Sequence, residues 1–183
     1  MRRGFLLTCE GIDGSGKSTA ARAIAEALRA KGLDVRERAE PTRSWLGQAV
    51  RRGFSEDVAP WTEALLFMAD HATHAREVRA ELAQGALVVS DRWSDSTFAY
   101  QGAALAAEAP DAVALLRDME RPFDLAPDLT LLFDLDVAEA LRRVGARGPA
   151  EKFERADFLE RVRANYLRLA RESPARFVTV DAS

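Results

Sequence analysis

A glycine-rich turn near the start of this 183-residue chain constrains its fold more than any other feature. Gly11, four further residues and then Gly16-Lys17-Ser18 complete the pattern G-x-x-x-x-G-K-[ST]. The turn follows the apolar run Phe5–Cys9 and precedes a stretch in which apolar residues recur with helical period. A strand, such a turn and a helix together surround a phosphate with backbone N–H groups and the positive N-terminal end of the helix.

The side chains of this turn suit a nucleoside triphosphate. The Lys17 ammonium can bridge β- and γ-phosphate oxygens, and the Ser18 hydroxyl can ligate Mg²⁺. The sequence therefore predicts that the turn binds a nucleoside triphosphate together with Mg²⁺. The residues assigned to this site are Gly11, Ile12, Asp13, Gly14, Ser15, Gly16, Lys17, Ser18 and Thr19.

Short apolar runs alternate with stretches of helical period along the whole chain. The runs do not alternate polar and apolar residues, which is typical of strands buried on both faces of a parallel sheet. Strands that alternate with helices imply right-handed βαβ units. We therefore expect one α/β domain over residues 1–183, with a five-stranded parallel sheet flanked by helices. The expected strands are Phe5–Cys9, Val35–Ala39, Ala86–Ser90, Leu129–Leu135 and Phe177–Asp181.

Composition excludes several classes of protein. The 26 Lys+Arg and 29 Asp+Glu give a formal net charge of −3, so the domain lacks the basic footprint of a protein that binds a nucleic acid polymer. No segment approaches the roughly 20 apolar residues that span a bilayer. The single cysteine, Cys9, cannot form an internal disulfide, and its place in an apolar run predicts a buried strand residue. We expect a cytoplasmic protein that does not bind membranes.

The turn alone does not say what happens to the γ-phosphate. A GTPase is disfavoured because the chain has no N-K-x-D segment, and Asn165 is its only asparagine. A small phosphotransferase remains, and its acceptor could be a deoxynucleoside or a nucleoside monophosphate. A nucleotide-sensing switch that only binds and hydrolyses ATP is a further alternative.

Polar clusters follow the expected strands, where open parallel sheets bind ligands. Arg43 could bind a phosphate dianion or be a solvated loop residue. Asp91 could hold a water on Mg²⁺, and the adjacent Arg92 could reach the reacting phosphates. On an expected helix, Phe67 offers a ring for stacking and His71 an imidazole for hydrogen bonding. We do not expect metal binding by the histidines of this helix, because no third ligand lies nearby in the sequence.

A basic segment follows the fourth expected strand. Residues 142–155 hold four arginines and a lysine, interrupted by glycine and proline. This pattern predicts a lid, at about residues 143–156, that closes over the triphosphate and excludes water. An exposed, charged helix end is the alternative.

In this order, these clusters resemble thymidylate kinase, a family of nucleoside monophosphate kinases that convert dTMP to dTDP. The resemblance runs from Glu10 to Ser183, and its most specific stretch is Asp91-Arg92-Trp93-x-x-Ser96-Thr97-x-Ala99-Tyr100-Gln101-Gly102. It implies the P-loop nucleoside monophosphate kinase fold with a short lid segment. It also implies ATP as donor, Mg²⁺ as cofactor, dTMP as acceptor and a homodimer.

On the donor side, the resemblance implies that Ser18 and Asp91 support Mg²⁺ and that Arg143 stacks on adenine. One form of the family carries a catalytic arginine within the turn. Here that position is Gly14, so the chain resembles the form in which the lid supplies the catalytic cations. The implied catalytic residues are Lys17, Arg92, Arg147 and Lys152.

On the acceptor side, the resemblance implies that Arg43 and Arg92 clamp the dTMP phosphate and that Phe67 stacks on thymine. His71 stands where most members have an arginine that donates to a thymine carbonyl, and we expect the imidazole to donate one hydrogen bond there. The other implied contacts are Asp13 with the 3′-hydroxyl, Tyr100 with the deoxyribose, and Ser96, Thr97 and Gln101 with the polar edge of the base and the sugar.

Overall fold

A five-stranded parallel sheet forms the centre of the protein, as expected from the apolar runs. The computed structural model describes residues 4–145 and 155–183. The sheet has the strand order β2-β3-β1-β4-β5, and every pairing is parallel. Its strands are β1 Phe5–Glu10, β2 Val35–Ala39, β3 Leu87–Asp91, β4 Leu129–Asp134 and β5 Phe177–Asp181. The bounds differ from the expected ones by one residue at four strand ends.

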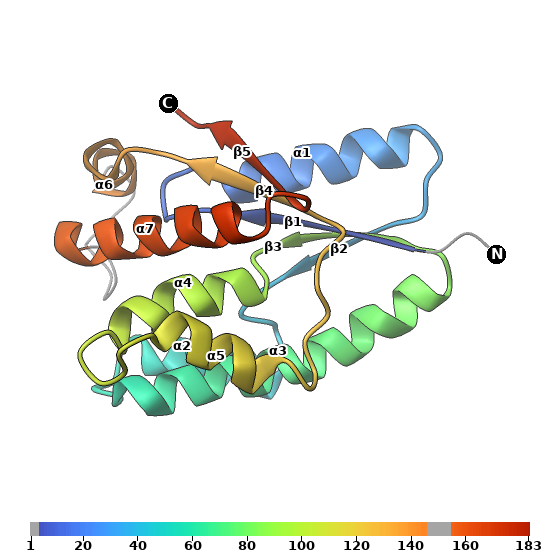
Figure 1. Ribbon diagram of the computed structural model, residues 1–183. Coiled ribbons are helices and arrows are strands. Elements are labelled where there is room, and N and C mark those ends of the chain that lie inside the picture. The colour runs from blue at the N-terminus through green and yellow to red at the C-terminus, as the bar shows by residue number, and fades with distance from the viewer. Residues whose placement is uncertain (1–3, 146–154) are drawn as a thin grey trace.

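Helices cover both faces of this sheet (Figure 1). Helix α1 packs on one face, and α3, α4 and α7 pack beneath the other face, with α2 and α5 outside them. The helices are α1 Lys17–Ala30, α2 Trp45–Gly53, α3 Pro60–Ala83, α4 Ser94–Ala104, α5 Ala112–Glu120, α6 Val137–Gly145 and α7 Ala156–Glu172. Within the described ranges, no helix has the length and apolar character needed to cross a bilayer.

The central strand β1 shows why the apolar runs are continuous. Leu7 and Cys9 pack against α1, whereas Leu6 packs against α3 residues on the opposite face. Successive side chains of a strand point to opposite faces, so burial on both faces requires an unbroken apolar run. Cys9 is fully buried, which confirms its expected place in a strand.

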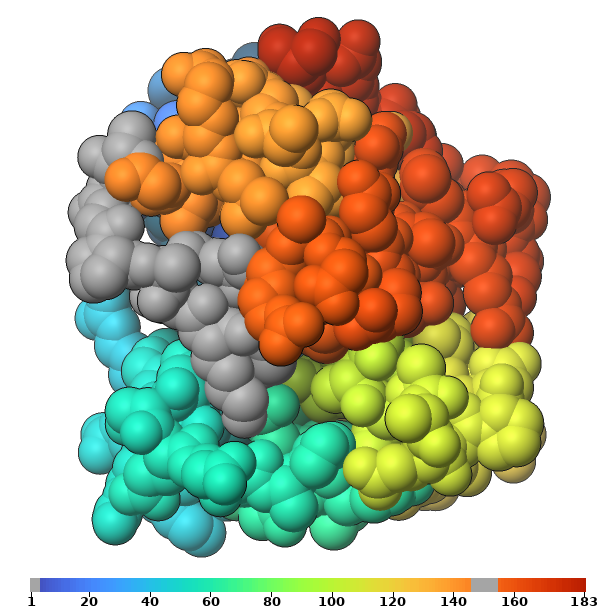
Figure 2. All heavy atoms as spheres, turned by 90° about the vertical axis from the view of Figure 1, so that its left-hand side faces the viewer, coloured from blue at the N-terminus to red at the C-terminus, as the bar shows by residue number. Residues whose placement is uncertain are grey.

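The parallel arrangement brings the carboxyl ends of all five strands to one edge of the sheet. The turn after β1, the loop after β2 and the Asp91-Arg92 pair at the end of β3 therefore lie at the same edge. Figure 2 looks onto this edge, with residues of α2 and α3 on one side and residues of α6 and α7 on the other. Ligands of open parallel sheets bind at this edge.

Candidate active site

The glycine-rich turn forms an anion site at the end of β1. Gly11, Gly14 and Gly16 have φ values of 144°, 89° and 87°, which side chains other than glycine rarely adopt. Gly16 precedes α1, and no side chain caps the helix, so its first N–H groups remain available. The Ser15 hydroxyl is buried and has no hydrogen-bond partner among the described residues. These donors suit the phosphates of a nucleotide.

Gly14 allows the turn to approach α6 closely. A Cβ built at Gly14 would lie 2.6 Å from the backbone oxygen of Ala140. A side chain at this position would therefore displace α6. The contact therefore leaves no space for a side chain at this position of the turn.

We expect Gly14→Ala to lower the melting temperature more than Gly32→Ala. Gly32 is the matched control, because its φ of 79° is similar but nothing lies within 4 Å of its added Cβ. Alanine costs roughly 1–2 kcal/mol of backbone strain at either position. At Gly14 the clash adds about 1–3 kcal/mol, which is about 2–4 °C per kcal/mol for a chain of this size. Scanning fluorimetry compares the two variants, and equal shifts would contradict the close approach.

Three charged side chains meet inside the turn. Lys17 Nζ lies 3.2 Å from Asp13 Oδ1, and Arg92 Nη2 lies 2.5 Å from the same oxygen. Burial opposes ionisation of Asp13, but the charges of Arg92 and Lys17 outweigh it and hold the pKa of Asp13 well below its ordinary value. Burial and the nearby Arg92 lower the pKa of Lys17. The carboxylate of Asp13 therefore joins the lysine of the turn to the arginine that follows β3.

Arg92 has a strained backbone. Its φ of 71° is the only positive value among the non-glycine residues of the described ranges. Three hydrogen bonds fix this conformation: Arg92 N donates to Cys9 O, Ser90 Oγ donates to Arg92 O, and Trp93 N donates to Glu10 Oε1 at 2.7 Å. The guanidinium lies over the Tyr100 ring at 4.9 Å and donates to Ser96 Oγ at 3.0 Å. Such strain is characteristic of functional sites.

Glu10 binds residues that contact Arg92 or follow it in the chain, and the sequence analysis did not identify Glu10 as a site residue. Its Oε2 accepts hydrogen bonds from Ser96 Oγ at 2.6 Å and from Tyr166 OH at 2.9 Å. Burial and the nearby Asp95 raise the pKa of Glu10 to about 8. The only sequence signals were a carboxylate at the end of a buried strand and a tyrosine in the apolar stripe of α7.

The free energy of unfolding is expected to fall as the pH rises from about 5 to about 9, partly because of Glu10. The unfolded carboxyl loses its proton near pH 4.5, whereas Glu10 in the folded protein keeps it until about pH 8. The folded state binds more protons between these values, so this stabilisation is lost as the pH rises. Glu10→Gln removes this titration.

Thermal melts from pH 5 to pH 9 test this expectation. The difference in melting temperature across the range should shrink by about 3 °C or more in Glu10→Gln, which corresponds to about 1 kcal/mol. Glu26→Gln, an exposed change on α1, is the control and should leave the slope unaltered. An unchanged slope in Glu10→Gln would contradict the raised pKa.

A large cavity of about 700 Å³ lies beside the turn and contains the candidate magnesium ligands. Ser18 and Asp91 both line it. Asp91 Oδ1 is buried and has no hydrogen-bond partner among the described residues. An unpaired carboxylate oxygen near a hydroxyl fits the all-oxygen ligand preference of Mg²⁺. Four arginines also line this cavity: Arg22, Arg38, Arg43 and Arg51.

A second cavity of about 130 Å³ adjoins the first at Pro41, which lines both. Phe67 forms an apolar wall of it with Phe54, at a ring distance of 6.2 Å. Gln101 also lines it, and both polar atoms of its amide are buried without a hydrogen-bond partner in the described structure. An apolar wall with an unpaired amide suits a flat ring that has donors and acceptors on its edge. The full lining is Asp13, Pro41, Phe54, Phe67, Arg92, Ser96, Tyr100 and Gln101.

The structure thus brings most of the expected acceptor residues together in the small cavity, but Arg43, Thr97 and His71 do not line it. Arg43 lines the large cavity with Ser18 and Asp91, whereas Arg92 lines the small one. Thr97 is buried, at 2% exposed, and is not part of the small cavity's lining.

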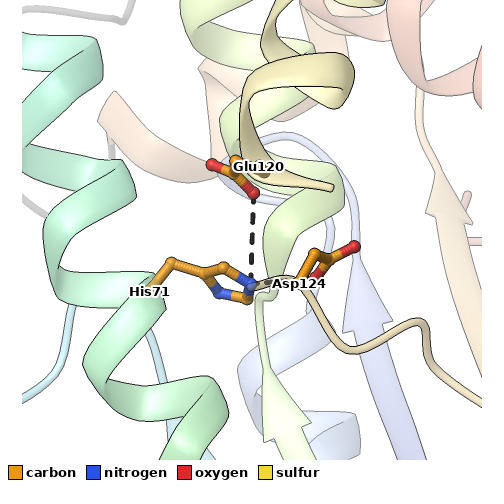
Figure 3. A group of neighbouring side chains, drawn as sticks. All are labelled: His71, Glu120 and Asp124. Atoms are coloured by element: carbon orange, nitrogen blue, oxygen red, sulfur yellow. Dashed lines mark hydrogen bonds and ion pairs between the residues drawn. The ribbon is translucent and has the colours of Figure 1, made fainter. Parts of the chain in front are cut away.

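The structure corrects the expectation that His71 contacts a substrate. Its side chain is fully buried, and both ring nitrogens are paired with carboxylates (Figure 3). Nδ1 lies 2.8 Å from Glu40 Oε1, and Nε2 lies 2.9 Å from Asp124 Oδ1. The ring also packs edge-on against Trp93 at 4.7 Å. His71 therefore has no free nitrogen to offer a base, and the prediction was wrong.

Arg143 connects the last turn of α6 to Ala182, the residue that follows β5. Its Nη1 donates to Ala182 O at 3.0 Å, and its Nε donates to Glu139 Oε1 at 2.6 Å. The expected lid lies mostly in residues 146–154, which are outside the described ranges. Arg147 and Lys152 belong to that segment, and their roles stay predictions.

A phosphate turn at the end of the central strand, beside a second cavity with its own arginine, defines a kinase of the P-loop nucleoside monophosphate kinase fold. A family model described as thymidylate kinase matches residues 9–183. The chain belongs to the thymidylate kinase family.

Individual relatives support this assignment along the whole chain. A probable thymidylate kinase of Methanococcoides burtonii is 44% identical over 186 residues, covering 98% of this chain and 89% of that protein. One of Halobacterium salinarum is 49% identical over 182 residues, covering 98% and 88%. The crystal structure of thymidylate kinase from Ehrlichia chaffeensis superposes with a TM-score of 0.77 at 28% identity, covering 97% of this chain and 92% of that one.

Proposed function

We propose that this enzyme transfers the γ-phosphoryl group of ATP to dTMP, giving ADP and dTDP. A phosphate oxygen of dTMP attacks the γ-phosphorus in line as the bond to the β-phosphate oxygen of ATP breaks. The observation that carries the proposal is the small cavity, in which Phe67 and Gln101 lie beside the Arg92–Asp13–Lys17 cluster of the phosphate turn. The donor phosphates and the acceptor would therefore meet at the edge of the sheet where the carboxyl ends of the strands lie.

On the donor side, Lys17 and the backbone of residues 11–18 hold the ATP phosphates, and Arg143 stacks on adenine. Ser18 and Asp91 hold Mg²⁺, which would neutralise charge on the phosphates. The unpaired Asp91 Oδ1 and the uncapped N-terminus of α1 support these roles.

On the acceptor side, Phe67 stacks on thymine, and Gln101 and Ser96 lie at its polar edge and sugar. Arg92, together with Arg43 from the adjoining cavity, orients the acceptor phosphate. Tyr100 lies against the deoxyribose, and Asp13 accepts from the 3′-hydroxyl. The buried and unpaired amide of Gln101 supports a base contact, because an amide left unpaired there costs about 1–3 kcal/mol.

The reaction needs no strong general base, because a phosphate monoester is already a nucleophile at neutral pH. Catalysis then rests on position and electrostatics. The contact of Gly14 with Ala140 leaves no space for a side chain at position 14 of the turn, so Arg147 and Lys152 of the lid add to the positive charge that Lys17 supplies to the transferring phosphoryl group.

We also propose a homodimer in the cytoplasm. Trp45 on α2 and Leu65 on the neighbouring α3 are large apolar side chains with exposed fractions of 75% and 51%. A dimer formed through α2 and α3 would remove both side chains from water. Light scattering after size exclusion measures the mass, and a monomer at micromolar concentration would contradict the dimer.

A coupled assay of ADP production across nucleoside monophosphates tests the proposed function. We expect dTMP to give the highest kcat/KM and ATP hydrolysis without an acceptor to be negligible. The panel includes dUMP, because His71 provides no contact to the base. A faster reaction with a purine or cytidine monophosphate would identify a different acceptor, and steady hydrolysis without any acceptor would indicate a switch-type ATPase.

A further inference from the structure

Three side chains that do not line the small cavity converge on one point. They are His71 of α3, Glu120 at the end of α5 and Asp124 in the loop that follows (Figure 3). One ligand atom from each lies within 4.8 Å of the other two. His71 Nε2 is 2.9 Å from Asp124 Oδ1 and 4.0 Å from Glu120 Oε2.

Glu120 is the independent sign that this cluster binds a ligand. Its side chain is fully buried, and neither carboxylate oxygen has a hydrogen-bond partner among the described residues. The carboxylate points at the imidazole of His71 (Figure 3). A carboxylate buried without hydrogen bonds is costly unless a cation compensates it.

For His71 to bind a metal, the ion must replace the proton between Nε2 and Asp124 Oδ1. His71 Nδ1 lies 2.8 Å from Glu40 Oε1, which also pairs with His74 Nδ1 at 2.8 Å. When Nδ1 donates its proton to Glu40, the lone pair of Nε2 faces the two acidic residues. A histidine that binds zinc through one ring nitrogen usually donates the N–H of the other nitrogen to a carboxylate or a carbonyl oxygen.

We propose that His71 Nε2, Glu120 and Asp124 bind a Zn²⁺ ion. One imidazole nitrogen and two carboxylates suit zinc, which three protein ligands and a water can surround. Two atoms bound to one tetrahedral zinc are about 3.4 Å apart, and the distances from His71 Nε2 lie on either side of this value. Asp124 is the partly exposed member, at 21% of its side chain, and provides the side from which water reaches the ion.

The ion would act structurally, because it would tie α3 to the end of α5 behind the ring of Trp93. The sequence analysis did not expect a metal at this histidine, because it found no ligand nearby in the sequence and Asp124 lies 53 positions from His71. The proposal does not depend on the identity of the acceptor nucleotide. An experiment can therefore contradict the zinc proposal without contradicting the proposed kinase activity, and the reverse.

Titration of metal-free protein with zinc sulfate, in competition with a chromophoric chelator, tests the proposal. We expect one Zn²⁺ per chain, and we expect Glu120→Gln and Asp124→Asn to weaken binding at least about tenfold. Asp118→Asn is the matched control on α5, with 70% of its side chain exposed. This control should leave the affinity unchanged.

X-ray absorption of the zinc-loaded wild-type chain gives a result that does not require a folded variant. We expect a first shell of oxygen and nitrogen with the multiple-scattering signature of one imidazole. Absence of stoichiometric binding, equal affinity in Glu120→Gln and Asp118→Asn, or a sulfur ligand in the shell would each overturn the proposal.

Discussion

Arg92→Ala is expected to lower kcat at least about 100-fold, the usual effect of removing a group that stabilises charge in a transition state. Its guanidinium lies between Asp13 of the phosphate turn and Ser96 and Tyr100 of the acceptor cavity. It is therefore the side chain that joins the two sites. Steady-state kinetics at saturating ATP and dTMP measure the effect, and near-UV circular dichroism verifies the fold.

Two further variants define the role of Arg92. Arg92→Lys keeps the charge but loses the planar fork, so we expect it to recover only a small part of kcat. Arg121→Ala, at 79% side-chain exposure, is the control for removal of an arginine and should retain normal rates. A kcat for Arg92→Ala within about threefold of the wild type would remove Arg92 from the catalytic residues.

Lys17→Ala is expected to reduce kcat by about 10²–10³-fold, with a smaller effect on the KM for dTMP. Lys17 is 5% exposed and is the first residue of α1, directly after Gly16. It can follow negative charge as this charge spreads over the transferring phosphoryl group. The measurement is kcat and both KM values at constant Mg²⁺.

Lys31→Ala provides the matched control for Lys17. Lys31 is an exposed lysine just past the other end of α1, so the change removes the same charge from the same helix without touching the turn. We expect wild-type kinetics from it. Comparable losses in both variants would mean that net charge, not the position of Lys17, decides the rate.

Strands β1, β3 and β4 could be predicted from the sequence because their residues form mostly apolar runs. The expectation of burial on both faces was wrong for β2 and β5, which lie at the two edges of the sheet and have three exposed residues each. Helix α4 could not be recognised from periodicity. All of its residues from Ser94 to Ala103 are buried, so no polar face alternates with an apolar one. A helix that is buried all round has no amphipathic pattern. Helices α2, α5 and α6 have nine residues each and give a weak periodic signal.

The phosphate turn could be predicted because its function depends on neighbouring residues in one short segment. The support of Arg92 could not, since Tyr166 approaches Glu10 from 156 positions away. The error at His71 has the same origin. The resemblance to the family implied a base contact at this position, but Glu40 and Asp124 are contributed by other segments and occupy both nitrogens.

Label transfer from [γ-³²P]ATP tests the central claim most directly, because it identifies both the group that moves and the acceptor. Parallel reactions contain dTMP, thymidine or no acceptor. We predict label in dTDP with dTMP, and neither labelled dTMP from thymidine nor rapid release of labelled phosphate. The proposal of two facing phosphate sites would be contradicted by faster phosphorylation of thymidine than of dTMP. It would also be contradicted if labelled inorganic phosphate were the main product in every reaction.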